Sequence, residues 1–91
     1  MEWYRFIILG RVQGVYYRKS VSQALMKKQF KGYIKNLENG TVEVVSEVFD
    51  DEFDSFMAVL KEGSLLSSVE DIKYEIINDA QFNTDGFEIR Y

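Results

Sequence analysis

The sequence predicts an α+β protein, a ferredoxin-like βαββαβ sandwich in which two helices pack on one face of an antiparallel sheet. Two observations carry this prediction. Segments with the apolar pattern of strands and segments with apolar residues three and four positions apart follow in the order β-α-β-β-α-β, with a short fifth strand at the C-terminus. Two helices of about three turns are also too few to cover a small sheet on both faces. We expect the strand order 4-1-3-2 and a single domain over residues 1–91.

The first half of the chain carries three predicted strands and one predicted helix. Apart from Arg5, residues 3–9 are all aromatic or aliphatic, and this pattern predicts a strand buried on both faces. From Arg18 to about Lys28, apolar residues recur at helical spacing, which predicts a helix with a narrow apolar stripe. Residues 32–37 and 41–48 are typical of strands, and an Asn-Gly pair between them is a tight-turn signal.

The second half predicts another helix and the last two strands. Asp50 and Asp51 are expected to cap a helix that ends at Gly63, since glycine is common at a helix C-terminus. Residues 69–77 form the fourth predicted strand, and a polar turn is expected over residues 78–86. The final segment, Phe-Glu-Ile-Arg-Tyr, is expected to form a short fifth strand.

The composition of the chain excludes several kinds of chemistry. The absence of cysteine excludes disulfides, and the absence of histidine removes the usual general base near neutral pH and the commonest zinc ligand. Fifteen acidic and eleven basic residues give a net charge of −4, which disfavours a nucleic-acid backbone as partner. No segment reads as a signal peptide or approaches the length of a membrane span, so we expect a cytoplasmic protein without a membrane partner.

A nonapeptide from Gly10 to Arg18 is the motif that points most directly to chemistry. It lies between the first predicted strand and the first predicted helix. A glycine-containing turn in this place collects backbone N–H groups that lack partners, next to the positive end of a helix. Together with a guanidinium, these donors would form a cradle for an anion.

A second motif, Gly-Tyr-Ile-Lys-Asn, occupies residues 32–36. In the predicted topology the first helix starts at the end of the sheet where the first strand finishes, and the second strand finishes at that same end. Arg18 and Asn36 therefore come to one end of the sheet, although eighteen positions separate them. Because the third strand lies between the first and the second, the backbones are about 10 Å apart, a gap that both side chains can reach into.

These two motifs, with Gly-Thr-Val-Glu at residues 40–43 and the Gly-Phe-Glu-Ile-Arg-Tyr ending, resemble the signature segments of acylphosphatases over nearly the whole chain. The resemblance implies hydrolysis of small acyl phosphates to a carboxylate and inorganic phosphate, without metal or cofactor. It also implies that Arg18 binds the phosphate and that Asn36 positions the attacking water. The amides that it assigns to phosphate binding belong to Arg11, Val12, Gln13, Gly14, Val15, Tyr16 and Tyr17.

These residue types suit the implied reaction. An acyl phosphate already has a good leaving group, so catalysis is mainly positioning and charge stabilisation. Arg18 stays protonated and can hold two phosphate oxygens, and the amide of Asn36 can orient a water but cannot deprotonate it. A chain without histidine therefore fits a mechanism without a strong general base, in which a phosphate oxygen of the substrate takes the proton.

Other residues near the motifs have simpler expected roles. Tyr17 falls on the apolar stripe of the helix and is expected in the core, and Gln13 is expected to be a loop residue without a chemical role. Tyr16 is expected to border the acyl group of the substrate. The α-carboxylate of Tyr91 is expected to brace Arg18. The chain also departs from the family at Gln29, where many members have glycine, so Gln29 must adopt a left-handed conformation or the helix must end otherwise.

Two other functions are open at this point. Ferredoxin-like sheets with exposed aromatic residues can stack nucleic-acid bases, but the acidic charge and the lack of an aromatic-basic signature on the central strands count against that function. The alternative to an enzyme is a non-catalytic acylphosphatase-like module that binds a small anion or a protein partner. For the enzyme, the partners are an acyl phosphate as substrate and inorganic phosphate as product or inhibitor, and a monomer is expected.

Overall fold

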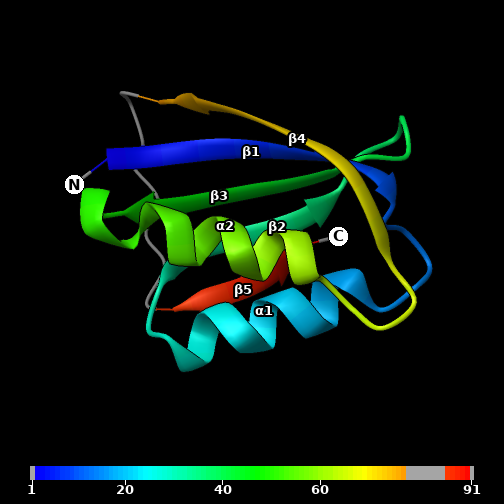
Figure 1. The fold of residues 1–91 in the computed structure, drawn as a ribbon, viewed down its shortest axis with the longest axis horizontal. Helices are drawn as coiled ribbons and strands as arrows, with labels where there is room; N and C mark the ends of the chain where they lie inside the picture. Colours follow the sequence, from blue (N-terminus) through cyan, green and yellow to red (C-terminus); the bar gives the residue numbers. More distant parts are fainter. Residues whose placement is uncertain (1, 78–85, 91) are drawn as a thin grey trace.

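The structure, a computed structural model, describes residues 2–77 and 86–90. The predicted order of strands and helices is confirmed, with a 3₁₀ turn added before the second helix (Figure 1). The predicted polar turn, apart from Gly86, lies outside the described residues. No helix in this part of the chain is long and apolar enough to cross a membrane. The elements are β1 (Glu2–Arg11), α1 (Tyr17–Lys27), β2 (Lys31–Asn36), β3 (Val42–Val48), η1 (Asp50–Glu52), α2 (Phe53–Glu62), β4 (Ser68–Ile76) and β5 (Phe87–Arg90).

The strands form one sheet in the order β4-β1-β3-β2-β5. The predicted order 4-1-3-2 is confirmed, and the fifth strand extends the sheet beyond β2. Every neighbouring pair is antiparallel except β2 and β5, which run parallel, so the expectation of an antiparallel sheet was wrong at this edge. The directions of the strands explain this pairing. β4 runs opposite to β1, and β5 runs back in the direction of β1 and β2. β5 is therefore parallel to its neighbour β2.

The register of the sheet sets the position of Asn36. Asn36 pairs with Val42 on β3, and Val42 in turn pairs with Ile8 on β1. Asn36 therefore lies two strands across from Ile8, at the end of the sheet where β1 leads into the loop before α1. Neighbouring strands are about 4.8 Å apart, so the two backbones are about 10 Å apart, as predicted.

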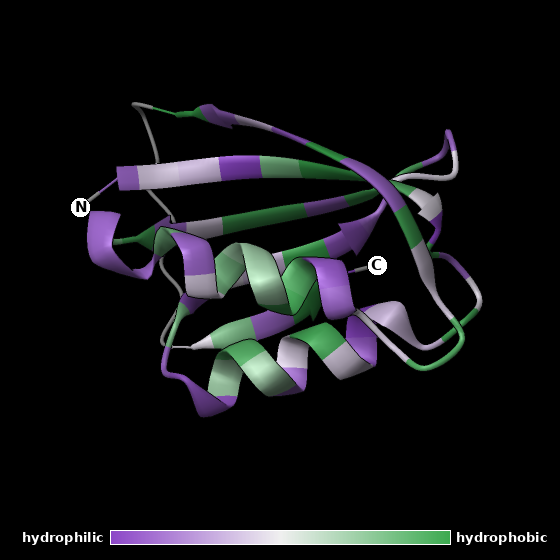
Figure 2. Cartoon of the chain, in the orientation of Figure 1, coloured by the Kyte–Doolittle hydropathy of each residue, from purple (hydrophilic) through white to green (hydrophobic). Residues whose placement is uncertain are grey.

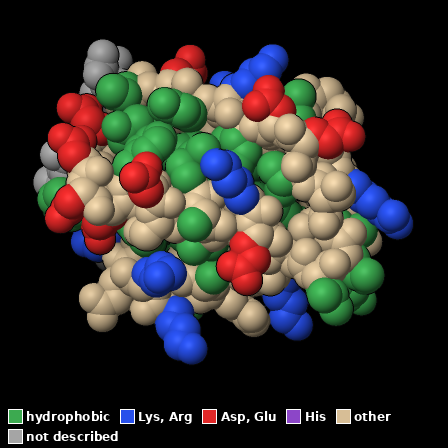
Figure 3. Space-filling model, viewed as in Figure 1, with side chains coloured by type: hydrophobic (Ala, Val, Ile, Leu, Met, Phe, Trp, Pro, Cys, Tyr) green, Lys and Arg blue, Asp and Glu red, His purple; other side chains and the backbone are tan. Residues whose placement is uncertain are grey.

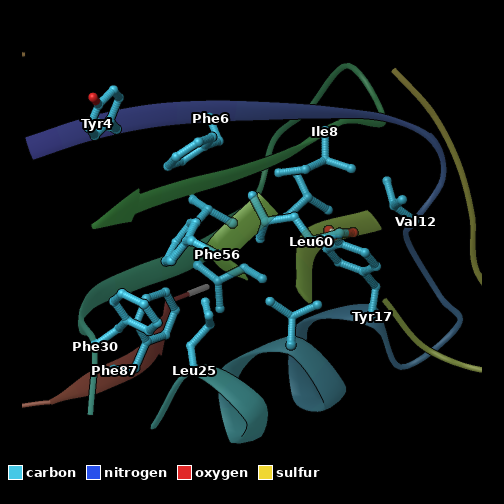
Figure 4. Packing of buried hydrophobic residues seen from close by; sticks show 14 of the residues in the cluster. Tyr4, Phe6, Ile8, Val12, Tyr17, Leu25, Phe30, Phe56, Leu60 and Phe87 are labelled. Atoms are coloured by element: carbon cyan, nitrogen blue, oxygen red, sulfur yellow. The ribbon is translucent and has the colours of Figure 1, made fainter. Parts of the chain in front are cut away.

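Both helices cover the same face of the sheet and turn their apolar sides toward it (Figures 1 and 2). In the core between them, Phe6 and Phe30 pack against Phe56 with ring centroids 5.0 and 4.9 Å away. Aromatic pairs at such distances add about 0.5–1.5 kcal/mol beyond burial. Tyr17 is buried in this core, as predicted, and its hydroxyl donates to the carbonyl of Leu60 at 2.7 Å. Figure 4 shows the cluster, which also includes Tyr4, Ile8, Val12, Leu25 and Phe87.

The other face of the sheet is covered by neither helix, and β1 shows the consequence (Figure 1). From Trp3 to Leu9 its residues alternate between partly exposed and buried, so the prediction of a strand buried on both faces was wrong. On the open face, the carboxylate of Glu43 accepts from Arg5 Nε at 2.6 Å and from the Tyr33 hydroxyl at 3.0 Å. Burial, followed by the hydrogen bond to Glu43, raises the pKa of Tyr33 to about 12.

The ends of the helices differ in part from expectation. Asp50 and Asp51 lie in η1, and neither η1 nor α2 has a side-chain hydrogen bond at its N-cap, so the predicted caps were wrong. The chain instead enters α2 through the 3₁₀ turn. Gly63 follows α2 with a φ of 57°, which confirms the predicted end. Gln29, after α1, has a φ of 67° and so adopts the left-handed conformation usual for glycine at this place.

Candidate active site

The loop between β1 and α1 is shaped by a bulge and by two left-handed residues. The pairing of β1 with β4 shifts in register between Leu9 and Gly10. Gly10 has a φ of 127°, and a Cβ there would lie 2.2 Å from the carbonyl oxygen of Ser68, so the bulge requires glycine. Gly14 and Tyr16 then have φ angles of 71° and 62°, which turn the chain into α1.

Apolar side chains hold this loop in place and leave its amides available. Val12, Val15 and Tyr17 are buried in the core, while Gly14 and Tyr16 face outward. Within residues 2–77 and 86–90, the N–H groups of residues 12–16 meet no hydrogen-bond acceptor. They gather at the N-terminus of α1, where the helix dipole is positive. The loop therefore offers backbone donors without a partner among the described residues, next to the positive end of a helix.

Gln13 ties this loop to the turn between β2 and β3. Its Nε2 donates to the carbonyl oxygens of Leu37 and Thr41, each at 2.8 Å. Leu37 directly follows Asn36, so the brace connects the loop to the strand that carries the amide. We expected Gln13 to be a loop residue without a chemical role; its structural role was missed because its partners lie more than twenty residues away in the chain.

Arg18 lies in the first turn of α1 and is partly buried. Its Nη1 donates to the backbone carbonyl of Arg90 in β5 at 3.0 Å. Arg90 is in register with Lys35, the residue before Asn36. β5 therefore supports the guanidinium from the edge of β2. The expected brace from the α-carboxylate of Tyr91 lies outside the described residues.

Asn36 ends β2 at the same end of the sheet. Its Oδ1 is buried and has no hydrogen-bond partner among the described residues. A buried acceptor without a partner costs about 1–3 kcal/mol, which a bound water or ligand can offset. Asn36 and Arg18 both line a cavity of about 370 Å³. The structure thus brings together the two residues that the sequence predicted to meet.

Six of the nine predicted site residues line this cavity, and the other three lie around it. Arg11 ends β1 and is exposed, Gln13 forms the brace, and Val15 is turned into the core. Lys19 and Ile89 line the cavity although sequence reasoning gave them no role. The lining comprises Val12, Gly14, Tyr16, Tyr17, Arg18, Lys19, Asn36 and Ile89.

The charge of the cavity favours an anion. Arg18 and Lys19 are its charged lining residues, and none of the described lining residues carries a carboxylate. The guanidinium offers a planar fork of donors, which matches phosphate oxygens better than a point charge does. Lys19 could have been suspected from the sequence, because it directly follows Arg18 at a helix N-terminus.

Loop amides at a helix start, a guanidinium and an amide meet at one end of a ferredoxin-like sandwich. This combination is typical of small α+β proteins that bind an oxyanion. Comparisons with known proteins then identify the family.

The acylphosphatase family model matches residues 4–89. The acylphosphatase of Bacillus licheniformis is 35% identical over 88 residues, which cover 97% of this chain and 93% of the relative. The crystal structure of acylphosphatase from Bacillus subtilis superposes with a TM-score of 0.89 at 35% identity and covers 100% of both chains. An acylphosphatase structure from Coxiella burnetii gives a TM-score of 0.84 at 29% identity, over 98% of this chain and 92% of the other. The chain belongs to the acylphosphatase family and is a hydrolase.

Proposed function

We propose that this protein hydrolyses small acyl phosphates to a carboxylate and inorganic phosphate, with Arg18 and the loop amides holding the phosphoryl group and Asn36 directing the attacking water. The observation that carries the proposal is the cavity that Arg18 and Asn36 both line, together with the buried Oδ1 of Asn36, which has no hydrogen-bond partner among the described residues. Each group alone is common on protein surfaces. Together they provide an anion site and a water acceptor within one space.

The phosphoryl group binds beside Arg18 and Lys19, the charged residues of the cavity lining. Arg18 donates to two of its oxygens, while the hydrogen bond from Nη1 to the Arg90 carbonyl holds the guanidinium plane in position. The amides of residues 12–16 take the remaining oxygen. These donors strengthen their hold as charge develops in the transition state, because they are already oriented and need no reorganisation.

Water attacks the phosphorus in line with the bond that breaks. Oδ1 of Asn36 accepts one hydrogen of the water and so orients its oxygen. The new P–O bond forms as the bond from phosphorus to the acyl oxygen breaks, and the electron pair leaves on the carboxylate. The proton of the water passes to a phosphate oxygen of the substrate, so the reaction requires no protein base with a pKa near neutrality.

The purified protein tests this proposal with benzoyl phosphate and acetyl phosphate as substrates. Arg18→Ala and Asn36→Ala are each expected to lower kcat/KM roughly a hundred- to a thousandfold. Arg18→Ala should also weaken inhibition by inorganic phosphate, while Asn36→Ala should leave that inhibition nearly unchanged. Lys35→Ala is a matched control, since it removes a charge next to Asn36 from a residue outside the cavity lining.

Wild-type turnover no faster than in buffer would overturn the proposal and favour a non-catalytic anion-binding module. A pH–rate profile with an essential base of pKa near 7 would contradict the mechanism alone. The net charge of −4 supports a protein that acts on a small substrate without a nucleic-acid partner, and we extend the proposal to a cytoplasmic monomer.

A further inference from the structure

A second groove adjoins the phosphate cavity at the N-terminus of α1. Its volume is about 380 Å³, and Tyr16 and Lys19 line both spaces. From the proposed activity, on which this step rests, we infer that the groove receives the acyl group of the substrate and favours apolar, flat acyl groups. Its other lining residues are Val15, Ser20, Gln23, Ser64, Leu65 and Leu66.

The apolar side chains of the groove are unusually exposed. Leu65 is 100% exposed, Leu66 61% and Tyr16 73%. Figure 3 shows hydrophobic side chains gathered at this corner, over the loop between α2 and β4. Scattered apolar residues on a surface need no explanation, but these three lie together beside an anion site. A ligand that covers them would remove apolar surface from water.

Hydrogen bonds between the two walls show that the groove is a built feature of the fold. Ser64 Oγ donates to the carbonyl of Val15 at 2.5 Å, and Ser20 Oγ donates to the carbonyl of Gly63 at 3.1 Å. These bonds tie the α2–β4 loop to the phosphate loop and to α1. At Gly63, where φ is 57°, a Cβ would lie 2.7 Å from the ring of Tyr17, so this approach of the α2–β4 loop to α1 requires glycine.

The chemistry of an acyl phosphate selects this groove for its acyl end. The acyl carbon is separated from phosphorus by one bridging oxygen, and in-line attack places that oxygen opposite the water held by Asn36. The acyl group therefore points away from Asn36, which does not line the groove. Tyr16 and Lys19 form the margin that the two spaces share. None of the groove's described lining residues is acidic, and its walls beyond Lys19 are apolar or uncharged. An aromatic acyl group would cover Tyr16, Leu65 and Leu66 better than an acetyl group would.

The test compares two substrates on a variant with a polar groove. Leu65→Ser combined with Leu66→Ser changes exposed side chains that carry no buried packing. We expect kcat/KM for benzoyl phosphate to fall about tenfold and that for acetyl phosphate to change by less than about twofold. Inhibition by inorganic phosphate should stay the same. Met26→Ser is the matched control, because it removes an exposed apolar side chain of α1 outside the groove.

Equal effects on the two substrates, or no effect on benzoyl phosphate, would overturn the inference. A binding experiment tests the inference about the groove independently of the proposed hydrolysis. Calorimetry should show that benzylphosphonate binds wild type about tenfold more tightly than methylphosphonate does, and that the double variant loses this difference. If wild type lacks turnover but discriminates between the phosphonates, the proposed activity fails and the groove stands. If the two phosphonates bind wild type equally, the inference about the groove is wrong, whether or not the protein turns over acyl phosphates.

Discussion

The guanidinium of Arg18 and the backbone carbonyl of Arg90 are joined by a hydrogen bond of 3.0 Å. The bond links the first turn of α1 to the last described strand, across seventy-two positions of the chain. It occupies one donor of the guanidinium fork and so restricts how the rest of the fork can turn. The main chain of β5 therefore helps to orient Arg18, the proposed phosphate-binding residue. Because the acceptor is a backbone carbonyl, a substitution of the side chain at position 90 would keep it.

Arg18→Lys tests whether this orientation matters beyond charge. Lysine keeps the positive charge but cannot donate to the Arg90 carbonyl and to two phosphate oxygens in one plane. We expect kcat/KM to fall about a hundredfold, with phosphate inhibition weakened less than in Arg18→Ala. Steady-state kinetics with inorganic phosphate as inhibitor measures both. Activity of the lysine variant close to that of wild type would mean that charge alone suffices.

Gln13→Leu is expected to destabilise the protein and slow the reaction. The variant loses two hydrogen bonds of 2.8 Å, although the carbonyls of Leu37 and Thr41 each keep a backbone donor, so the free energy of unfolding should fall by about 1–2 kcal/mol. The loop then loses its hydrogen bond to Leu37, the residue after Asn36, so Asn36 is positioned less well and kcat should fall about tenfold. Urea unfolding and initial rates are the measurements. Glu38→Leu, at an exposed position in the same turn, should change neither.

Gln29→Gly is expected to stabilise the fold by about 0.5 kcal/mol, because it removes the strain of a side chain at a φ of 67°. Urea unfolding of the variant measures the gain. Lys28→Gly is the control: Lys28 has a φ of −86°, so glycine there only adds freedom to the unfolded chain and should cost about 0.5–1 kcal/mol. Destabilisation by both changes would show that Gln29 makes an offsetting interaction.

Stability should decline in alkali through the buried tyrosines. Burial raises the pKa of both Tyr17 and Tyr33, the latter to about 12, above the value of 10.0 for a free tyrosine. The unfolded chain therefore releases these protons first. The protonated tyrosines therefore contribute fully to the free energy of unfolding below pH 10, and this contribution is lost as the pH rises toward 12. Urea midpoints across this range should fall less steeply with pH in Tyr33→Phe than in wild type. Parallel curves for the two proteins would show that Tyr33 does not cause the loss of stability in alkali.

Most of the fold could be predicted because it is encoded in local patterns. The spacing of apolar residues specified both helices, and an Asn-Gly pair marked the hairpin between β2 and β3. The position of β5 could not be predicted in this way. Its pairing of Gly32 with Phe87 joins residues more than fifty positions apart, and nothing in either segment encodes the other. The error at residues 3–9 has another origin: Arg5 lies among the apolar residues and faces the open side of the sheet, where it pairs with Glu43, and the prediction overlooked it.

The candidate site was predictable where topology alone brings residues together. Arg18 and Asn36 lie in one cavity because α1 begins, and β2 ends, at the same end of the sheet. The supports of these residues could not be predicted. One partner of Arg18 is a backbone carbonyl, a group that every residue has, so the sequence does not mark Arg90 as that partner. The bonds of Gln13 likewise end on carbonyls.

The parallel pairing of β5 with β2 also has a consequence for biosynthesis. Residues 87–90 emerge from the ribosome after every other described segment, yet they supply the carbonyl that holds the arginine. A nascent chain halted before them contains the loop, the arginine and the asparagine, but the arginine has no Arg90 carbonyl to anchor it. The order of synthesis thus delays the assembly of this end of the sheet until residues 87–90 have been made.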